Sequence, residues 1–241
     1  MDSAAPLFAG WKKTMVRSCL QGHMGTVVTD GRTPPESALC AVGDFCFLAG
    51  KPDPELARQA DRPILIPRTP DWEPVLRSVF SEKLSPFTRY AMEGPEAFDR
   101  ERLAAYAAAL PEGYALSPIL PQHYPVLMGQ AWSKDLCGNF RDGDDFVRRG
   151  LGVIALQDGI PVAGASSYTI HDGGVEIEID TRPDQRRKGL ALSCGARLIL
   201  DCLDRGLVPS WDAHNLPSVA LAEKLGYRLR APYQAYLLNL N

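Results

Sequence analysis

The second half of the chain alternates apolar and polar residues over short runs, and this pattern predicts β-strands. Two longer stretches repeat apolar residues every three or four positions, which is typical of amphipathic helices. Asp-Gly pairs between the runs are turn signals. The predicted order is three antiparallel strands, a helix, a strand, a helix and a last strand, at residues 152–157, 162–170, 175–181, 190–204, 207–212, 217–225 and 233–240. A strand at 114–120 and short helices at 126–132 and 144–149 precede this series.

The first 110 residues show a less regular pattern. Short apolar runs predict strands, and an aspartate followed by proline or by an amphipathic stretch predicts a helix start. The expected elements are strands at 25–30, 38–49 and 63–67, and helices that begin near 53 and 71 or span 98–110. The whole pattern predicts an α/β (α+β) protein, with a smaller N-terminal α/β region at residues 1–110 and a larger domain at residues 111–241.

The segment between the strand at 175–181 and the helix at 190–204 has the features of an anion site. The strand breaks at Pro183, and the helix begins just after Gly189. Three cations stand in a row between them: Arg186, Arg187 and Lys188. A helix N-terminus offers unpaired N–H groups, and glycine lets a phosphate approach the main chain. Cations at a helix start oppose the helix dipole, so a phosphorylated ligand explains them better than a solvated surface does.

This segment resembles the coenzyme loop of the GCN5-related N-acetyltransferases (GNAT family). The family signature is Arg/Gln-x-x-Gly-x-Gly/Ala, with a proline three residues ahead, and residues 186–191 together with Pro183 match it. A second family element is an Asn, a small residue and an apolar residue at spacings of three, followed by Gly and an aromatic. It is matched by Asn215, Ser218, Leu221, Gly226 and Tyr227. The resemblance is strong over residues 150–227 and extends to a GNAT subgroup that has an extra N-terminal region and includes zwittermicin A resistance proteins.

The resemblance implies a GNAT fold at residues 111–241, with a mixed, mostly antiparallel sheet flanked by helices. It implies an N-acetyltransferase that moves an acetyl group from acetyl-CoA to a primary amine by direct transfer in a ternary complex. The expected acceptor is a small molecule, conceivably an antibiotic. A protein or peptide amine and a non-catalytic CoA-binding module are the alternatives. The N-terminal region is either a degenerate copy of the second half or an unrelated cap that shapes the acceptor pocket.

The resemblance also implies which residues hold the coenzyme. Main-chain groups before the loop pair with the pantetheine, the loop and the helix start hold the pyrophosphate, and the start of the last helix contacts the cofactor. The expected cofactor-binding residues are Ile179, Asp180, Thr181, Arg186, Arg187, Lys188, Gly189, Leu190, Ala191, Asn215 and Ser218. The alternative role of Asn215 is to cap the helix that follows it.

Two glutamates on the strand before the loop are candidate catalytic bases. Acyl transfer to an amine requires a neutral nitrogen, so a base must accept its proton. In a regular strand, Glu176 and Glu178 point away from the face that carries the apolar residues. A β-bulge could re-aim one of them, and a solvated polar face is the alternative. Carboxylates at this level are bases in many GNAT enzymes, and we expect Glu178, which is nearer the thioester, to be the base.

The chain departs from the family at one catalytic position. Many GNAT enzymes carry a tyrosine seven residues after the Asn, which protonates the leaving thiolate, and Ala222 stands there. The candidate replacements are Tyr227, Tyr233 and Tyr236, each of which is more typical of packing. His214 is a further candidate base, with a structural role as its alternative.

The amino-acid composition argues against several other classes of function. A formal net charge of −3 over 241 residues argues against nucleic-acid or anionic-membrane binding. The six cysteines and four histidines are scattered, so we expect no metal site and free thiols in a reducing cytoplasm. No apolar run approaches the roughly 20 residues of a membrane span, and no signal peptide is recognisable. The sequence does not decide whether the protein forms a homodimer.

Overall fold

The computed structural model describes residues 3–240, and the contacts between Cα atoms divide them into two compact units. Unit 1 comprises the described residues up to 89 and from 232 onwards, and unit 2 comprises residues 90–231. These bounds differ from the division expected at residue 110. The reason is that the helix α4 (Arg100–Ala108) packs on α7 (Leu190–Asp204) of unit 2, whereas the C-terminal strand returns to unit 1.

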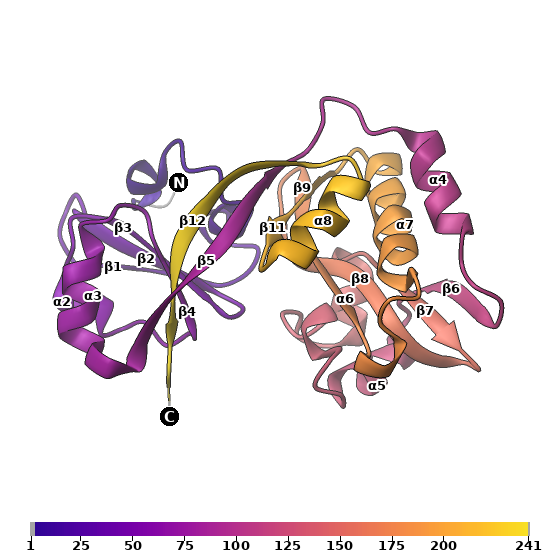
Figure 1. Cartoon of the computed structure of the whole chain (residues 1–241). Coiled ribbons are helices and arrows are strands. Elements are labelled where there is room, and N and C mark those ends of the chain that lie inside the picture. Colours follow the sequence, from indigo (N-terminus) through magenta and orange to yellow (C-terminus); the bar gives the residue numbers. More distant parts are fainter. Residues whose placement is uncertain (1–2, 241) are drawn as a thin grey trace. The chain divides into compact units, whose positions relative to one another are not determined.

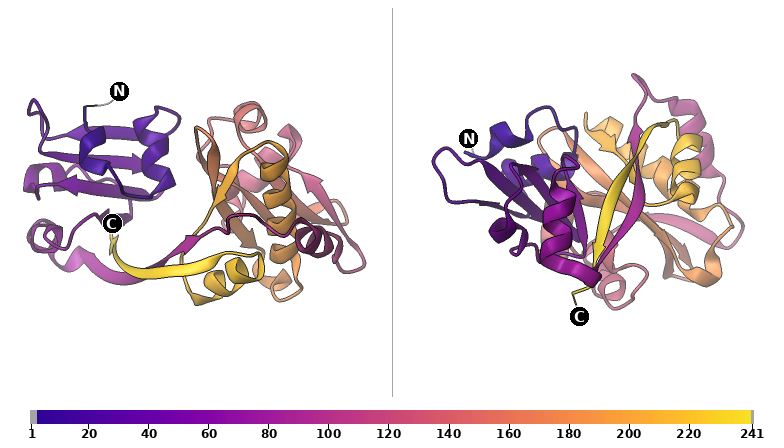
Figure 2. Two further views of the ribbon diagram at one scale, coloured as in Figure 1. Left: turned by 90° about the horizontal axis from the view of Figure 1, so that it is seen from above. Right: turned by 60° about the vertical axis from the view of Figure 1, so that its left-hand side comes forward.

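Unit 1 is a sheet (Figure 1) whose strands β2 and β3 are buried on both faces. Strands β1 to β4 lie in sequence order, followed by β12 and β5, which run as neighbours in the right-hand view of Figure 2. Leu56, Trp72 and Leu76 from the helices are almost fully buried against the sheet. The elements are η1 (Ala5–Phe8), α1 (Thr14–Leu20), β1 (Thr26–Thr29), β2 (Ser37–Val42), β3 (Phe45–Gly50), α2 (Pro54–Ala57), β4 (Ile64–Pro67), α3 (Trp72–Phe80), η2 (Ser81–Lys83), β5 (Leu84–Glu93) and β12 (Arg228–Leu238).

Unit 2 is built on a five-stranded sheet in the order β10-β9-β8-β7-β6. Its strands from β6 to β9 pair antiparallel, and β10 pairs parallel to β9. The elements besides α4 and α7 are β6 (Tyr114–Pro118), η3 (Pro121–His123), α5 (Tyr124–Met128), η4 (Lys134–Leu136), α6 (Gly143–Arg149), β7 (Gly152–Gln157), β8 (Ile160–His171), β9 (Gly174–Thr181), η5 (Pro183–Gln185), β10 (Val208–Ser210), β11 (Asp212–Ala213) and α8 (Leu216–Lys224). No helix among residues 3–240 combines the length and apolar character needed to cross a bilayer.

The longest helix, α7, lies along the sheet of unit 2 and has the bounds that its sequence pattern predicts (Figure 1). Gly189 caps its start in the left-handed conformation, and Gly206 follows its end. Cys194, Leu198 and Cys202 form the fully buried stripe that faces the strands. The amphipathic pattern and the two glycines therefore determine this element locally.

Two predicted strands are interrupted. The segment at 38–49 forms the hairpin of β2 and β3, because Gly43 and Asp44 turn the chain and Gly43 has a positive φ of 53°. The segment at 207–212 breaks at Trp211 into β10 and β11. β10 pairs with β9, whereas β11 pairs antiparallel with the end of β5. The chain thus leaves the five-stranded sheet at Trp211.

The same order of elements occurs twice along the chain. Three antiparallel strands, a helix, a strand parallel to the third one, a second helix and a last strand are formed by β1, β2, β3, α2, β4, α3 and β5. The second series is β7, β8, β9, α7, β10, α8 and β12, which is the order that the sequence predicts. The last strand of each series crosses the boundary between the two units.

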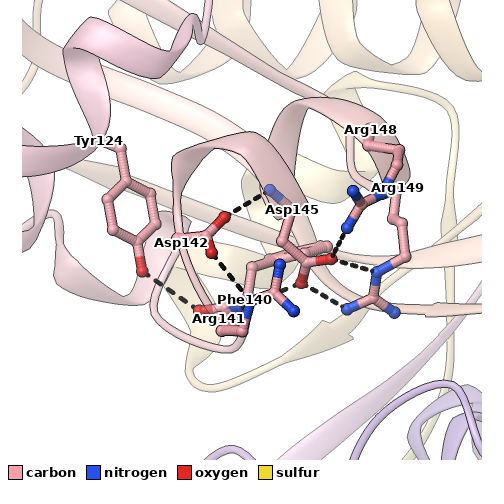
Figure 3. A network of polar contacts seen from close by, with 7 residues as sticks. All are labelled: Tyr124, Phe140, Arg141, Asp142, Asp145, Arg148 and Arg149. Atoms are coloured by element: carbon pink, nitrogen blue, oxygen red, sulfur yellow. Dashed lines mark hydrogen bonds and ion pairs between the residues drawn. The ribbon is translucent and has the colours of Figure 1, made fainter.

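A buried carboxylate holds α6 and the loop before it together (Figure 3). Asp145 is 4% exposed and accepts hydrogen bonds from Arg149 at 2.7 and 2.8 Å and from Arg148 at 2.8 Å. The Arg141 main-chain N–H donates to it at 3.3 Å, and Asp142 caps the helix by accepting from the Asp145 N–H at 2.7 Å. The Arg149 guanidinium is the main cause that holds the pKa of Asp145 well below its usual range.

Asp145→Asn is expected to lower the free energy of unfolding by ~2 kcal/mol at pH 7, because charged hydrogen bonds are lost while the arginines stay in place. A carboxyl with a lowered folded-state pKa contributes its full stability above the unfolded value near 3.9, and this contribution is lost as the pH falls further. Denaturant titration should therefore show a difference between variant and wild type that shrinks below about pH 4. Asp144→Asn, an exposed change on the same helix, is the control. An equal loss in both variants would attribute the effect to net charge alone.

Candidate functional site

An open strand edge is the central feature of unit 2. β10 pairs with β9 only along Gly174, Val175 and Glu176. Beyond Glu176, β9 continues to Thr181 with β8 on its other edge. The next segment of the chain, β11, pairs with β5 instead. Within the described part of unit 2, the last five residues of β9 therefore have a strand on one edge only.

Main-chain groups of Ile179 face this open edge. The Arg182 N–H donates to Val162 on β8 at 2.9 Å, and the alternation of an antiparallel ladder then turns the groups of Thr181 and Ile179 away from β8. The Thr181 N–H donates to the Asp180 carboxylate at 2.6 Å. Burial raises the pKa of Asp180, whose own main chain faces β8. Of the three residues expected to pair with pantetheine, Ile179 is the one whose N–H and C=O both face the open edge without contacting Asp180 or Arg186.

The three cations of the loop have different surroundings. Arg186 donates to the Thr181 carbonyl at 3.2 Å, and its guanidinium lies 3.7 Å from the Asp180 carboxylate. The Lys188 ammonium donates to Gln185 at 2.7 Å and to the Tyr114 hydroxyl at 3.0 Å. Arg187, in contrast, makes no hydrogen bond or ion pair with any residue from 3 to 240. Two cations therefore brace the loop, and the third is available to an anion.

The start of α7 is accessible. Gly189 has a φ of 83°, and a Cβ placed on it would meet no heavy atom within 4 Å. The N–H groups of the first helical turn have no carbonyl to reach, because the first helical bond runs from Ser193 to Gly189 at 3.1 Å. The neighbouring Arg187 also adopts a positive φ of 65°, which helps to turn consecutive N–H groups toward one side. Free donors, open space and one unpaired cation fit the diphosphate of a coenzyme.

Glu176 and Glu178 lie on the opposite face of β9 from α7. Ile179 defines the α7 face, since a Cβ on Gly195 of the helix would lie 3.2 Å from its Cδ1. Glu176 is 5% exposed and is the last residue that pairs with β10, whereas Glu178 is half-buried. The bulge between β8 and β9 is on β8 rather than on β9, so both glutamates keep the same face.

Trp211 fixes the point at which the strand leaves the sheet. Its indole N–H donates to the Ser218 hydroxyl at 3.1 Å, and its ring centroid lies 5.5 Å from that of Tyr227. The Asn215 side chain accepts from the Ser218 N–H at 2.9 Å and so caps α8. The capping role expected of Asn215 as an alternative is therefore present. The link from Trp211 to Ser218 joins residues seven positions apart, and no sequence signal distinguished it.

The three tyrosines that could replace the missing proton donor either bond the main chain or belong to unit 1. The Tyr227 hydroxyl donates to the Pro209 carbonyl at 2.9 Å, and burial raises the pKa of Tyr227 well above its usual value. Tyr233 and Tyr236 belong to unit 1, and desolvation raises the pKa of Tyr236 to about 12. Ala222 is fully buried in α8. Within unit 2, Tyr227 is therefore a packing residue.

Comparison with known proteins gives consistent results. A family model described as GNAT acetyltransferase matches residues 5–236. A Bacillus subtilis (strain 168) protein named "Uncharacterized N-acetyltransferase YdfB" is 27% identical over 195 residues, which are 79% of this chain and 71% of that protein. A crystal structure of a GCN5-related N-acetyltransferase-like protein from Streptococcus suis 89/1591 is 43% identical, covers 98% of this chain and 97% of its own, and has a TM-score of 0.94.

A GCN5-related N-acetyltransferase from Kribbella flavida is 18% identical with a TM-score of 0.57, over 95% of each chain, and shows a likeness of fold alone. The family model extends across nearly the whole chain, including both series of strands and helices. The loop signature, the open edge of β9 and these similarities lead to one conclusion: this chain is a member of the GNAT acetyltransferase family.

Proposed function

We propose that this protein transfers an acetyl group from acetyl-CoA to the primary amine of a small molecule, in the cytoplasm and by direct attack in a ternary complex. The observation that carries the proposal is the open edge of β9 beside the accessible start of α7. An edge with unpaired amide groups accepts a chain of amides such as pantetheine. A helix start with free N–H groups accepts the diphosphate. Both lie on consecutive segments of one unit.

On the coenzyme side, acetyl-CoA supplies an activated acetyl thioester. The N–H groups from Arg187 to Ala191 hold its diphosphate, and Ile179 pairs with the pantetheine. Arg187 adds a positive charge that no protein carboxylate neutralises among the described residues. Arg186 and Lys188 act mainly on the loop itself, because their charged groups already contact Asp180, Gln185 and Tyr114.

On the acceptor side, a glutamate of β9 accepts the proton of the amine, directly or through water. The sequence favoured Glu178. The strand pairing favours Glu176 as the base instead, since Glu176 lies where β10 leaves β9 and is largely shielded from solvent. A shielded carboxylate is a stronger base than an exposed one. Loss of the proton makes the nitrogen nucleophilic, and main-chain N–H groups near the strand divergence polarise the thioester oxygen.

The leaving thiolate needs no dedicated acid in this proposal. Tyr227 is committed to Pro209, and Ala222 carries no polar group. A thiol with a pKa near the roughly 8.5 of cysteine leaves as an anion at moderate cost. The absent acid also favours a second candidate, a CoA-binding module without turnover, whereas a peptide amine is a third candidate that keeps the same coenzyme site. We also propose that the chain belongs to the GNAT subgroup that has an extra N-terminal region and includes zwittermicin A resistance proteins.

The first series of elements is, in this proposal, a degenerate copy of the second that binds no coenzyme. Its order of strands and helices is the same, but its first helix, α2, is a single turn. The Asp53 carboxylate accepts from the N–H groups of Glu55 and Leu56 at 2.8 and 3.0 Å. An anion of the protein therefore occupies the place that corresponds to the diphosphate site at α7.

The direct test is release of free CoA thiol from acetyl-CoA in the presence of a panel of small amines, polyamines, aminopolyols and peptides. Turnover on a small amine is the expected result. Turnover on peptides alone would show that the acceptor is a peptide amine instead of a small molecule. CoA binding without turnover on any amine would favour a non-catalytic CoA-binding module.

For the base, Glu176→Gln is expected to lower kcat by ~100-fold, within the range of general base catalysis, while the Kd for CoA stays within about twofold because the carboxylate lies off the coenzyme edge. Glu178→Gln is the matched variant on the same face. Steady-state kinetics and calorimetry on both variants decide between them. If Glu178→Gln is the more damaging change, the base is Glu178, and if neither lowers kcat, no glutamate of β9 is the base.

For the coenzyme, Gly189→Glu should weaken CoA binding by ~100-fold or more, because it would place a negative charge against the diphosphate. Gly189→Gln is the control, since it carries the same bulk and the same strain at positive φ, about 1–2 kcal/mol, without the charge. Isothermal calorimetry with CoA measures both variants. Equal affinities of the two variants would mean that the diphosphate does not lie at α7.

A further inference from the structure

Strand β8 contains one residue more than its partner β9. Ser167 lies opposite Ile177 and Thr169 opposite Glu176, so Tyr168 is the extra residue of a β-bulge. A bulge interrupts the ladder and leaves main-chain groups of the extra residue without their usual partner. Tyr168 is buried, so its carbonyl needs another donor.

An asparagine from a distant segment supplies that donor. The Asn139 side-chain amide donates to the Tyr168 carbonyl at 2.9 Å. Just before it in sequence, the carbonyl of Leu136 accepts from the Ser166 hydroxyl at 2.5 Å. Residues 136–139, from the end of η4 onwards, therefore hold β8 at Ser166 and at the bulge residue Tyr168 itself.

The bulge stands level with the divergence of the strands. Glu176 is opposite Thr169 on one edge of β9, and on the other edge it is the last residue to pair with β10, opposite Ser210. Both edges of β9 thus change their pairing between Glu176 and Ile177. A bulge increases the local twist of its strand pair, so its position sets the direction in which the Glu176 side chain and the open edge point.

We propose that Asn139 is a positioning residue for acetyl transfer: by holding the Tyr168 carbonyl, it fixes the bulge and thereby the Glu176 carboxylate at the strand divergence. The inference rests on the proposed function of Glu176 as base. Asn139 does not touch the reacting atoms and acts through β8. Its amide donates to the carbonyl of the one residue that the register between β8 and β9 skips.

Asn139→Asp tests this role, because it keeps the shape of the side chain and replaces the N–H donor with a carboxylate oxygen. Its kcat should fall by ~10-fold or more, since small displacements of reacting groups are costly, with the KM for acetyl-CoA within about twofold of wild type. The acidic limb of the kcat pH profile should shift, because the Glu176 environment changes. Thr169→Val is the control: its buried hydroxyl has no partner among residues 3–240, and the change should leave kcat unaltered.

A double variant separates positioning from general destabilisation. If Asn139 acts through Glu176, Asn139→Asp should cost little further kcat in a Glu176→Gln background, whereas independent effects would multiply. Hydrogen exchange of residues 166–181 reports the bulge without activity, and Asn139→Asp should speed exchange there.

Unchanged exchange in Asn139→Asp would overturn the clamp, whether or not the protein turns over any amine. Faster exchange with an unaltered kcat and pH profile would reduce Asn139 to a structural role and overturn the positioning claim. A wild-type protein that transfers no acetyl group would remove the proposed function, and with it the catalytic part of the inference, while the exchange result would still decide whether Asn139 holds the bulge.

Discussion

The candidate site of unit 2 depends on one constraint, which is that β9 loses its parallel neighbour after Glu176. An unpaired edge inside a sheet is costly unless something satisfies its amide groups. The chain sustains it by fixed contacts on both sides. Trp211, anchored on Ser218, diverts the leaving strand, and Asn139 satisfies the bulge on β8. In our proposal, this open edge pairs with the amide groups of the pantetheine.

The charges of the loop before α7 are also arranged by specific contacts. The anion site that we propose in unit 2 belongs to a chain of net charge −3, so it cannot rely on a generally basic surface. Two of its three cations brace the loop against Asp180 and Gln185, and Arg187 makes no such contact with residues 3–240. Main-chain dipoles at the start of α7 supply the rest, and they hold an anion without long flexible side chains.

Local signals predicted the parts of the fold that local interactions determine. The helix at 190–204 has its predicted bounds because a buried stripe and two glycines define it. The break at Trp211 was not predictable, because it arises from pairing of β11 with the distant β5. Asn139 contacts a residue 29 positions away in the sequence. Lys188 differs from Arg187 because it donates to Tyr114 and Gln185. Periodicity carries no information on such contacts.

A crystal structure of the protein with CoA bound tests the central claim most directly. We expect the diphosphate against the N–H groups that open α7, beside Arg187, with the pantetheine amides along Ile179 and the thiol pointing to the divergence of β9 and β10. Coenzyme bound at another place in the chain, with the edge of β9 still open, would contradict it.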